Sequence, residues 1–313
     1  MTQALWNILW IAVFPGFLFS FSLGLLASWV VRKVSALVQW RVGPPLLQPV
    51  YDIAKLLGKE ILVPEEARKG IFMAAPLIGM SGVLLLCTLL WRTAISQSPF
   101  VGDVIVVMYL MVLPSLAFIL GSSASASPHA AIGAAREMKL VMGYELPLVL
   151  ALIVVIVKTG GQLNLVAIAQ QTPVFSISGM IAFLVSLLCV QAKLGFVPFD
   201  IAESETEIAS GILMEYSGAL LAVWQAMQAL MLVALPLFLV TVFLGGFGTT
   251  GWALVAGIGK YVLILVLIIL IKNTNPRMRI DQAMRFFWVY CGIATVVAVL
   301  LATIGSANGI GWL

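Results

Sequence analysis

Charged residues are scarce in this chain of 313 residues: 10% are charged, whereas 62% are apolar. An ordinary soluble domain carries about 25% charged residues, so the composition excludes that class. Apolar runs near the length of about 20 residues that spans a bilayer as a helix recur along the whole sequence. A transmembrane β-barrel would instead show alternating segments of about ten residues. The sequence therefore predicts an all-α integral membrane protein, with residues 1–313 forming a single polytopic domain.

Residues that carry cofactor chemistry are also scarce. The three cysteines, Cys87, Cys189 and Cys291, lie in separate apolar segments without a C-x-x-C pair, which excludes the usual iron–sulfur and zinc motifs. The one histidine, His129, lies in a loop of small residues. The sequence contains no phosphate-binding loop, flavin signature or nucleophile motif. We therefore expect no catalytic residue, metal ligand or bound cofactor in this chain.

Eight membrane spans are predicted, together with one shorter helix discussed below. The first has neither the positive start nor the cleavage site of a signal peptide, so we expect it to be retained. The sixth contains Pro236, which favours a kink. The predicted spans are residues 5–31, 71–91, 104–121, 141–158, 178–195, 212–244, 252–272 and 283–305.

The basic residues are distributed unevenly between the two sides that these spans define. Of the 17 lysines and arginines, all except Arg92, Lys158 and Lys260 lie in or beside the connections that follow spans 1, 3, 5 and 7. Connections that are rich in lysine and arginine usually face the cytoplasm. The sequence thus predicts a multi-pass membrane protein with both termini outside, and the resemblance described below implies the cytoplasmic membrane of a prokaryote. Every acid except Asp103 also lies toward the cytoplasmic half, and the positive-inside rule does not explain that bias.

The first cytoplasmic connection, residues 39–60, reads QWRVGPPLLQPVYDIAKLLGKE. The Gly-Pro-Pro sequence excludes helix, and Pro49 suits the start of one. After it, apolar residues recur at helical spacing from Val50 to Leu57, and Asp52, Lys55 and Lys59 share another face. This pattern predicts a short amphipathic helix on the cytoplasmic side. It would serve either as an interfacial anchor or as a docking platform for a soluble partner.

Acidic residues gather in two further segments. Residues 197–218 carry five acids and no base, and Asp200, Glu203 and Glu207 would share one face if the segment were helical. Glu215 would then lie deeper, within the sixth span. Glu145 falls in the first turns of the fourth span, where an ionisable group is costly and indicates function. Either these carboxylates line a path for protons or cations, or they form a solvated surface.

Four motifs in order resemble the H subunit (mitochondrial subunit 1) family of respiratory complex I and its relatives in membrane-bound [NiFe] hydrogenases. They extend over about residues 20–300. The motifs comprise Gln39, Arg41, Gly43-Pro44, Gln48-Pro49, Asp52, Lys55-Leu56 and Lys59-Glu60; Arg136 with Tyr144-Glu145; PFD-x-x-E-x-E-x-E-x-x-S-G with Glu215-Tyr216; and PR-x-R-x-DQ-x-M. Quinone-reducing members usually have a longer insert before the Gln-Pro pair. The short RVGPPLLQP sequence therefore looks closest to the energy-converting hydrogenase branch, linked to ferredoxin or carbon monoxide dehydrogenase.

The resemblance implies a non-catalytic membrane anchor and coupling subunit of an oxidoreductase complex. Its partners would be cytoplasmic hydrogenase large and small subunits and a ferredoxin-like Fe-S subunit, which hold the Fe-S clusters and the [NiFe] centre, and antiporter-like membrane subunits. Electron transfer from ferredoxin to protons would drive H⁺ or Na⁺ translocation. The implied ion pathway is Glu145, Asp200, Glu203, Glu207 and Glu215. The implied arm contacts are Arg41, Gly43, Pro44, Gln48, Asp52, Lys55, Lys59, Arg136, Glu137, Lys139, Arg277, Arg279 and Asp281.

Three alternatives remain open from the sequence. One is the corresponding membrane subunit of a quinone-reducing, complex I-like dehydrogenase. Another is a stand-alone ion transporter, which the lack of evident internal repeats disfavours. The third is a structural anchor without an ion path, in which basic segments such as residues 272–288 serve topology alone.

Overall fold

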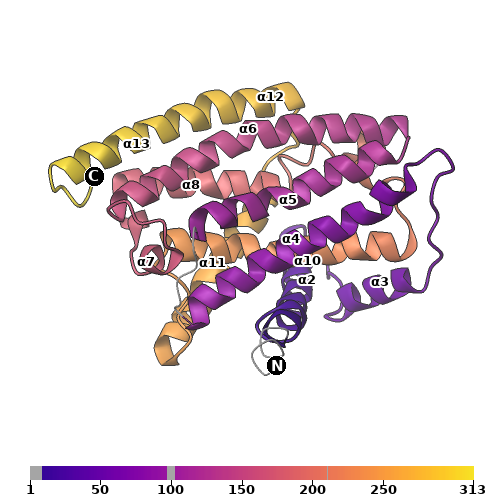
Figure 1. Cartoon of the computed structure of the whole chain (residues 1–313), viewed down its shortest axis with the longest axis horizontal. Coiled ribbons are helices and arrows are strands. Elements are labelled where there is room, and N and C mark those ends of the chain that lie inside the picture. The colour runs from indigo at the N-terminus through magenta and orange to yellow at the C-terminus, as the bar shows by residue number, and fades with distance from the viewer. Residues whose placement is uncertain (1–8, 97–102, 210) are drawn as a thin grey trace.

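The structure is a computed structural model that describes residues 9–96, 103–209 and 211–313. Within these residues the chain is helical and contains no strand. Figure 1 shows the arrangement of the elements. Their bounds are α2 (Phe17–Val38), α3 (Gln48–Leu57), α4 (Lys69–Ser96), α5 (Asp103–Ala124), α6 (Pro128–Lys158), α7 (Leu165–Ala169), η1 (Pro173–Phe175), α8 (Ile177–Lys193), α9 (Glu205–Ile208), η2 (Gly211–Leu213), α10 (Gly218–Phe243), α11 (Gly251–Thr274), α12 (Ile280–Arg285), η3 (Phe286–Cys291) and α13 (Gly292–Ala307).

The predicted set of membrane helices is confirmed. Within the described ranges, seven helices are long and apolar enough to cross a membrane, and α8 is a shorter apolar helix. The sixth span begins later than expected, because residues 214–217 are not helical and α10 starts at Gly218. Glu215 therefore lies in the connection before α10, and the prediction that it lies within the span is wrong.

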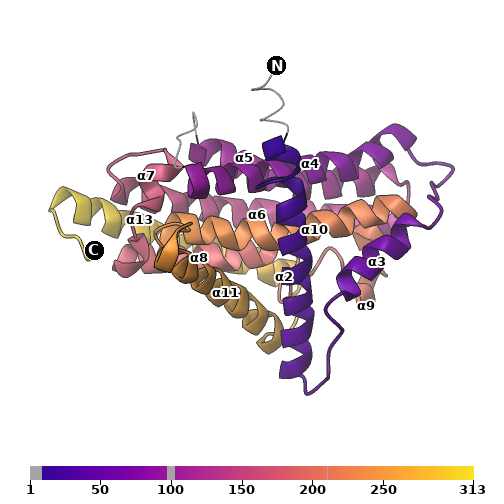
Figure 2. The same ribbon diagram turned by 90° about the horizontal axis from the view of Figure 1, so that it is seen from below.

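The helix α10 forms the centre of the bundle. It packs against α4 on one side and α2 on another, and α6, α8 and α13 form a further layer. Figure 2 shows α2 crossing α10 at a steep angle. Leu230, Leu235 and Phe238 of α10 are almost completely buried. Because α10 is apolar around its whole circumference, this central position is the one its sequence favours.

The helix α8 ends alongside the middle of α6, where Lys193 at the end of α8 contacts Glu145 of α6. Roughly 25 Å of α6 therefore extends beyond α8. The connection of residues 194–217 folds back into this space. Gly133 of α6 makes the approach possible, because a Cβ there would lie 2.9 Å from the backbone nitrogen of Ile212. The early end of α8 and the close approach of the connection to α6 at Gly133 together position the site described below.

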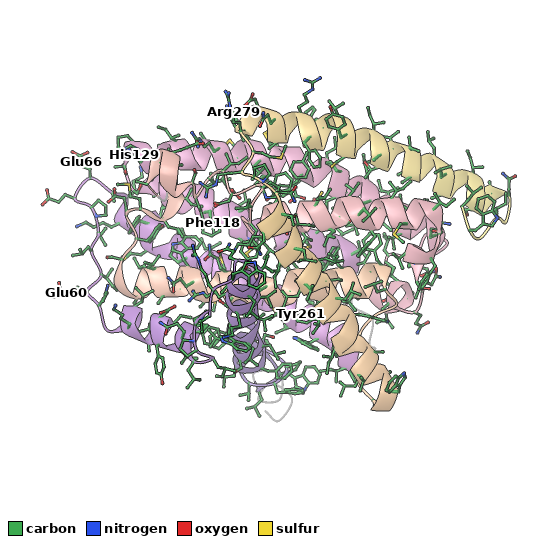
Figure 3. All side chains as sticks on the ribbon, turned by 180° about the vertical axis from the view of Figure 1, so that it is seen from behind. Glu60, Glu66, Phe118, His129, Tyr261 and Arg279 are labelled. Carbon is green, nitrogen blue, oxygen red and sulfur yellow. The ribbon has the colours of Figure 1, made fainter. Side chains whose placement is uncertain are left out.

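The amphipathic helix predicted after the first span is confirmed as α3. Pro49 lies at its start, and Asp52 of α3 forms an ion pair of 2.6 Å with Arg32 of α2. The apolar residues Val50 and Leu57 are exposed rather than covered by the rest of the chain. Figure 3 shows Glu60, Glu66 and His129 at the same end of the molecule, which we call the α3 side.

Candidate functional site

A cavity of about 470 Å³ opens where α8 stops short. Its walls come from α2, the first half of α6, the end of α8, α10 and the connection of residues 194–217. Both acidic and basic side chains line it, together with the amides of Gln225 and Gln228 of α10. A concave site with several converging polar groups is the usual form of a functional site.

Three acids line the cavity: Glu137 of α6, and Asp200 and Glu203 of the connection. Gln228 Nε2 donates a hydrogen bond of 3.2 Å to Glu203 Oε1. Burial, followed by the negative charges of Asp200 and Glu137, raises the pKa of Glu203 to about 8. Glu203 is therefore largely protonated at pH 7 and able to exchange a proton near neutral pH.

Basic side chains hold the connection in place around these acids. Arg277, from the segment between α11 and α12, donates to Asp200 Oδ2 at 2.7 Å and to Ser204 Oγ at 2.8 Å. The ammonium of Lys272 lies 4.3 Å from the centroid of the Phe196 ring. The Met278 N–H donates to the Pro198 carbonyl at 3.0 Å. The segment after α11 thus clamps the cavity wall.

The predicted single helical face of acids is wrong. Asp200 and Glu203 precede the helix, and α9 extends only from Glu205 to Ile208. Glu207 lies outside the cavity lining, half exposed, and accepts a hydrogen bond of 2.5 Å from Arg136. Glu215 also lies outside the lining. Short polar stretches containing Pro198 and glycines fold as connections, which is why helical spacing misplaced these acids.

Glu145 lies outside the cavity lining and is paired with a cation that the sequence did not assign to the site. Its carboxylate accepts a hydrogen bond from Lys193, whose side chain is only 1% exposed. Lys193 also lines the cavity, so the pair closes its inner end. A lysine at the end of the fifth predicted span, facing an acid in the fourth, was the available sequence signal.

Two hydroxyl groups connect Glu137 to the same region. Ser115 of α5 interacts with the Glu137 carboxyl, and its Oγ lies 3.1 Å from the Tyr144 hydroxyl. The Lys193 ammonium lies 4.8 Å from the centroid of the Tyr144 ring. Neither hydroxyl was named as a site residue from the sequence. A chain of polar groups thus runs from the cavity wall to Tyr144, whose ring face lies against the Lys193 ammonium.

Of the residues expected to contact a soluble arm, Gln48, Asp52 and Lys55 lie on α3 and Lys59 follows it, whereas Arg279 lies away from the α3 side in Figure 3. Glu137 differs from the others, because it is only 9% exposed and lines the cavity. Gly43 adopts a left-handed conformation (φ +73°) in the turn before α3, and Pro44 accepts a hydrogen bond of 3.2 Å from Trp29 Nε1. Gln48 and Asp52 are hydrogen-bonded to each other and partly buried, and Arg136 pairs with Glu207. The exposed members are Arg41, Lys55, Lys59, Lys139, Arg277, Arg279 and Asp281.

No group of three His, Cys, Asp or Glu side chains comes close enough to hold a metal ion within the part of the chain that the structure describes. The cavity acids instead lie among arginines, lysines and glutamines. This arrangement suits proton exchange and ion pairing.

Comparison with known proteins identifies the family. The NADH dehydrogenase family model matches residues 11–303. The chain is 32% identical over 283 residues to the H subunit of NADH-quinone oxidoreductase from Dehalococcoides mccartyi strain CBDB1, covering 85% of this chain and 78% of that protein. It is 33% identical over 297 residues to the H subunit of the same oxidoreductase from Geobacillus thermodenitrificans, covering 88% and 87%.

A solved structure is similar over nearly the whole chain. It is a chain of the membrane-bound sulfane sulfur reductase, an archaeal respiratory membrane complex, with a TM-score of 0.83 and 27% identity. The similarity covers 91% of this chain and 96% of that one. The expected resemblance is thereby confirmed, and the chain belongs to the NADH dehydrogenase family, as a membrane subunit of the H type found in complex I-like oxidoreductases.

Proposed function

We propose that this chain couples electron transfer in an attached cytoplasmic arm to ion translocation, with the acid-lined cavity as the entrance of the ion path. The observation that carries the proposal is the convergence of Glu137, Asp200 and Glu203 on one cavity that ends at the Lys193–Glu145 pair. The proposed path uses four acids, which are Glu137, Asp200, Glu203 and Glu145. Glu207 serves as the partner of Arg136, and Glu215 takes no part in it.

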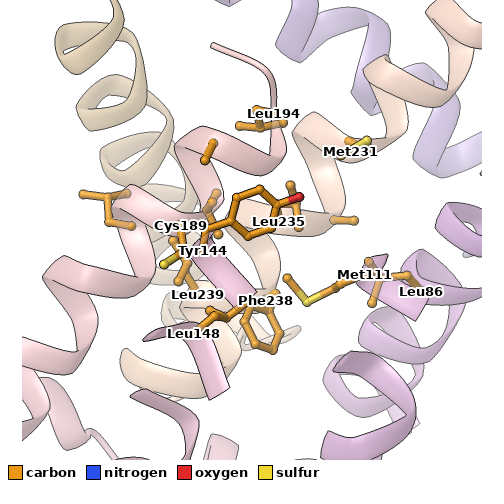
Figure 4. Packing of buried hydrophobic residues seen from close by; sticks show 14 of the residues in the cluster. Leu86, Met111, Tyr144, Leu148, Cys189, Leu194, Met231, Leu235, Phe238 and Leu239 are labelled. Carbon is orange, nitrogen blue, oxygen red and sulfur yellow. The ribbon is translucent and has the colours of Figure 1, made fainter. Parts of the chain in front are cut away.

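The path turns sideways after the pair. Figure 4 shows Tyr144 packed among buried apolar side chains, including Leu148, Leu235 and Phe238. Glu145 keeps 22% of its side chain exposed, beside the exposed Met142 and Leu146 of α6. A carboxylate exposed to lipid is costly, so an antiporter-like membrane subunit against α6 is the partner that would receive the ion.

The α3 side supplies the surface for the arm. Lys55 of α3 and Lys59, just after it, are exposed to solvent, and Trp40 in the preceding turn is 98% exposed. An exposed tryptophan beside several cations is a composition that protein interfaces favour. With the arm on this side, the α3 side faces the cytoplasm, and the C-terminus, at the opposite end of the molecule in Figure 1, faces outside.

Two electron acceptors are supported by different observations. Relatives that are H subunits of NADH-quinone oxidoreductases support an arm that reduces quinone, and we place this first. The short turn between α2 and α3, with RVGPPLLQP in place of a longer insert, supports the energy-converting hydrogenase branch. In that case Fe-S clusters and a [NiFe] centre would lie in the partner subunits.

Purification of the tagged chain from its native membrane with its partners tests the proposal. Flavin, Fe-S clusters and quinone reduction without nickel would assign the quinone branch. Nickel with ferredoxin- or viologen-driven hydrogen evolution would assign the hydrogenase branch. Recovery of a lone chain that moves ions in liposomes would contradict a coupling subunit and indicate a stand-alone transporter.

A further inference from the structure

The Lys193 ammonium lies among groups that would also coordinate a free cation. It donates to the Glu145 carboxylate and, at 3.4 Å, to the backbone carbonyl of Met111. The face of the Tyr144 ring, with its negative potential, lies 4.8 Å from the nitrogen. Carboxylate and backbone carbonyl oxygens are the groups with which membrane proteins replace the hydration shell of Na⁺ or K⁺.

Three separate helices build this arrangement. Met111 belongs to α5, Glu145 to α6 and Lys193 to α8. Pro114, three residues after Met111, lacks the N–H that would bond the carbonyl of Leu110 in α5. The ammonium is shielded from solvent, since the Lys193 side chain is 1% exposed. Its position is therefore fixed by the fold.

We propose that Lys193 is a tethered cation that permanently occupies a monovalent cation site formed by Glu145, Met111 and Tyr144, and thereby excludes Na⁺ from the inner end of the cavity. A metal ion would have to displace a covalently attached charge that already satisfies the carboxylate. A proton needs no vacant site, because it moves by exchange between hydrogen-bonded groups such as Ser115 and Tyr144. If the chain has the proposed coupling function, the ion that it handles is therefore H⁺.

Equilibrium binding of radioactive sodium to the purified complex, in choline buffer, tests this directly. We expect Lys193→Ala to gain a saturable sodium site that the wild type lacks. Lys193→Arg should gain none, because it keeps a tethered cation. The double variant Lys193→Ala/Glu145→Gln should also gain none, because the carboxylate is lost. Absence of a new site in Lys193→Ala would overturn the proposal, as would sodium binding by the wild type that Glu145→Gln abolishes.

The Lys193→Ala variant leaves the Glu145 carboxylate without its partner, so its assembly is itself informative. Assembly that requires Na⁺ and fails in choline would support the cation site. Assembly that fails equally in both would overturn it. A failure of the proposed coupling function would give a different result. The Glu203→Gln and Glu145→Gln variants would then translocate ions at the wild-type rate, whether or not Lys193→Ala binds sodium.

Discussion

Arg277 Nη2 donates to Asp200 Oδ2 over 2.7 Å, joining the segment after α11 to the wall of the cavity across 77 residues of sequence. The same guanidinium reaches Ser204 Oγ, so it holds both ends of a short polar stretch. The connection that carries Glu203 is therefore positioned by Arg277, a basic residue of a segment that we propose contacts the arm. A movement of the arm at Arg277 would be transmitted to the cavity acids.

Replacing Arg277 by Gln should uncouple the complex while leaving it assembled. A hydrogen bond to a charged group contributes about 1.5–3 kcal/mol, so the connection should loosen measurably. We expect electron transfer to persist and the ratio of ions translocated to electrons transferred to fall several-fold in liposomes. Arg279→Gln is the matched control, because Arg279 is 78% exposed and its pair with Asp281 is long, at 3.4 Å. Equal losses in both variants would remove Arg277 from the coupling.

The stability of the complex should fall as pH rises through about 8 because of Glu203. Its folded pKa of about 8 lies above the ordinary value of 4.5, so the fold favours the protonated carboxyl. The stabilisation is complete below the unfolded pKa and is lost as pH rises through the folded one. Glu203→Gln stays neutral and should flatten this decline in thermal unfolding midpoints measured between about pH 6 and pH 9.

The exposed carboxylate of Glu66 provides the control for that experiment. Glu66→Gln should leave the pH dependence of the unfolding midpoint unchanged, because the side chain is in solvent at the α3 side. A wild-type midpoint that stays constant across this pH range would contradict a protonated Glu203.

Charge reversal on α3 should weaken attachment of the arm. Lys55→Glu/Lys59→Glu replaces two exposed cations beside the turn, and association driven by such charges changes by about tenfold and depends on salt. The charge-conserving variant Lys55→Arg/Lys59→Arg should bind normally. Retention of the arm on the tagged membrane subunit during washes of increasing ionic strength measures the difference. Equal retention of the arm by both variants would show that α3 is an interfacial anchor.

Gly211→Ala should destabilise the cavity wall. Gly211 has φ +47°, and a Cβ there would collide with the Ala202 carbonyl oxygen. The left-handed conformation alone costs a residue other than glycine about 1–2 kcal/mol. Gly259→Ala in α11 is the control, since nothing lies within 4 Å of its added Cβ and alanine favours helix. Unfolding midpoints in detergent should fall for Gly211→Ala and hold or rise for Gly259→Ala.

The sequence predicted the membrane helices and α3, because apolar length and helical spacing are local properties. It misplaced the acids, because whether residues 197–217 are helical depends on tertiary packing: α8 stops at Lys193, and the connection fits against Gly133. Glu137 was expected to contact the arm because the resemblance implies that contact for its segment, although its own side chain is buried. The Lys193–Glu145 pair joins residues 48 positions apart, which no local pattern reports.

Proton uptake by liposomes containing the purified complex, measured together with electron transfer, tests the coupling path most directly. We predict that the wild type couples the two, and that Glu203→Gln and Glu145→Gln each keep electron transfer but lose about tenfold or more of the proton uptake, since a proton-transferring group is removed. Full proton uptake in both single variants would contradict a path through the cavity and leave the chain as an anchor for the arm.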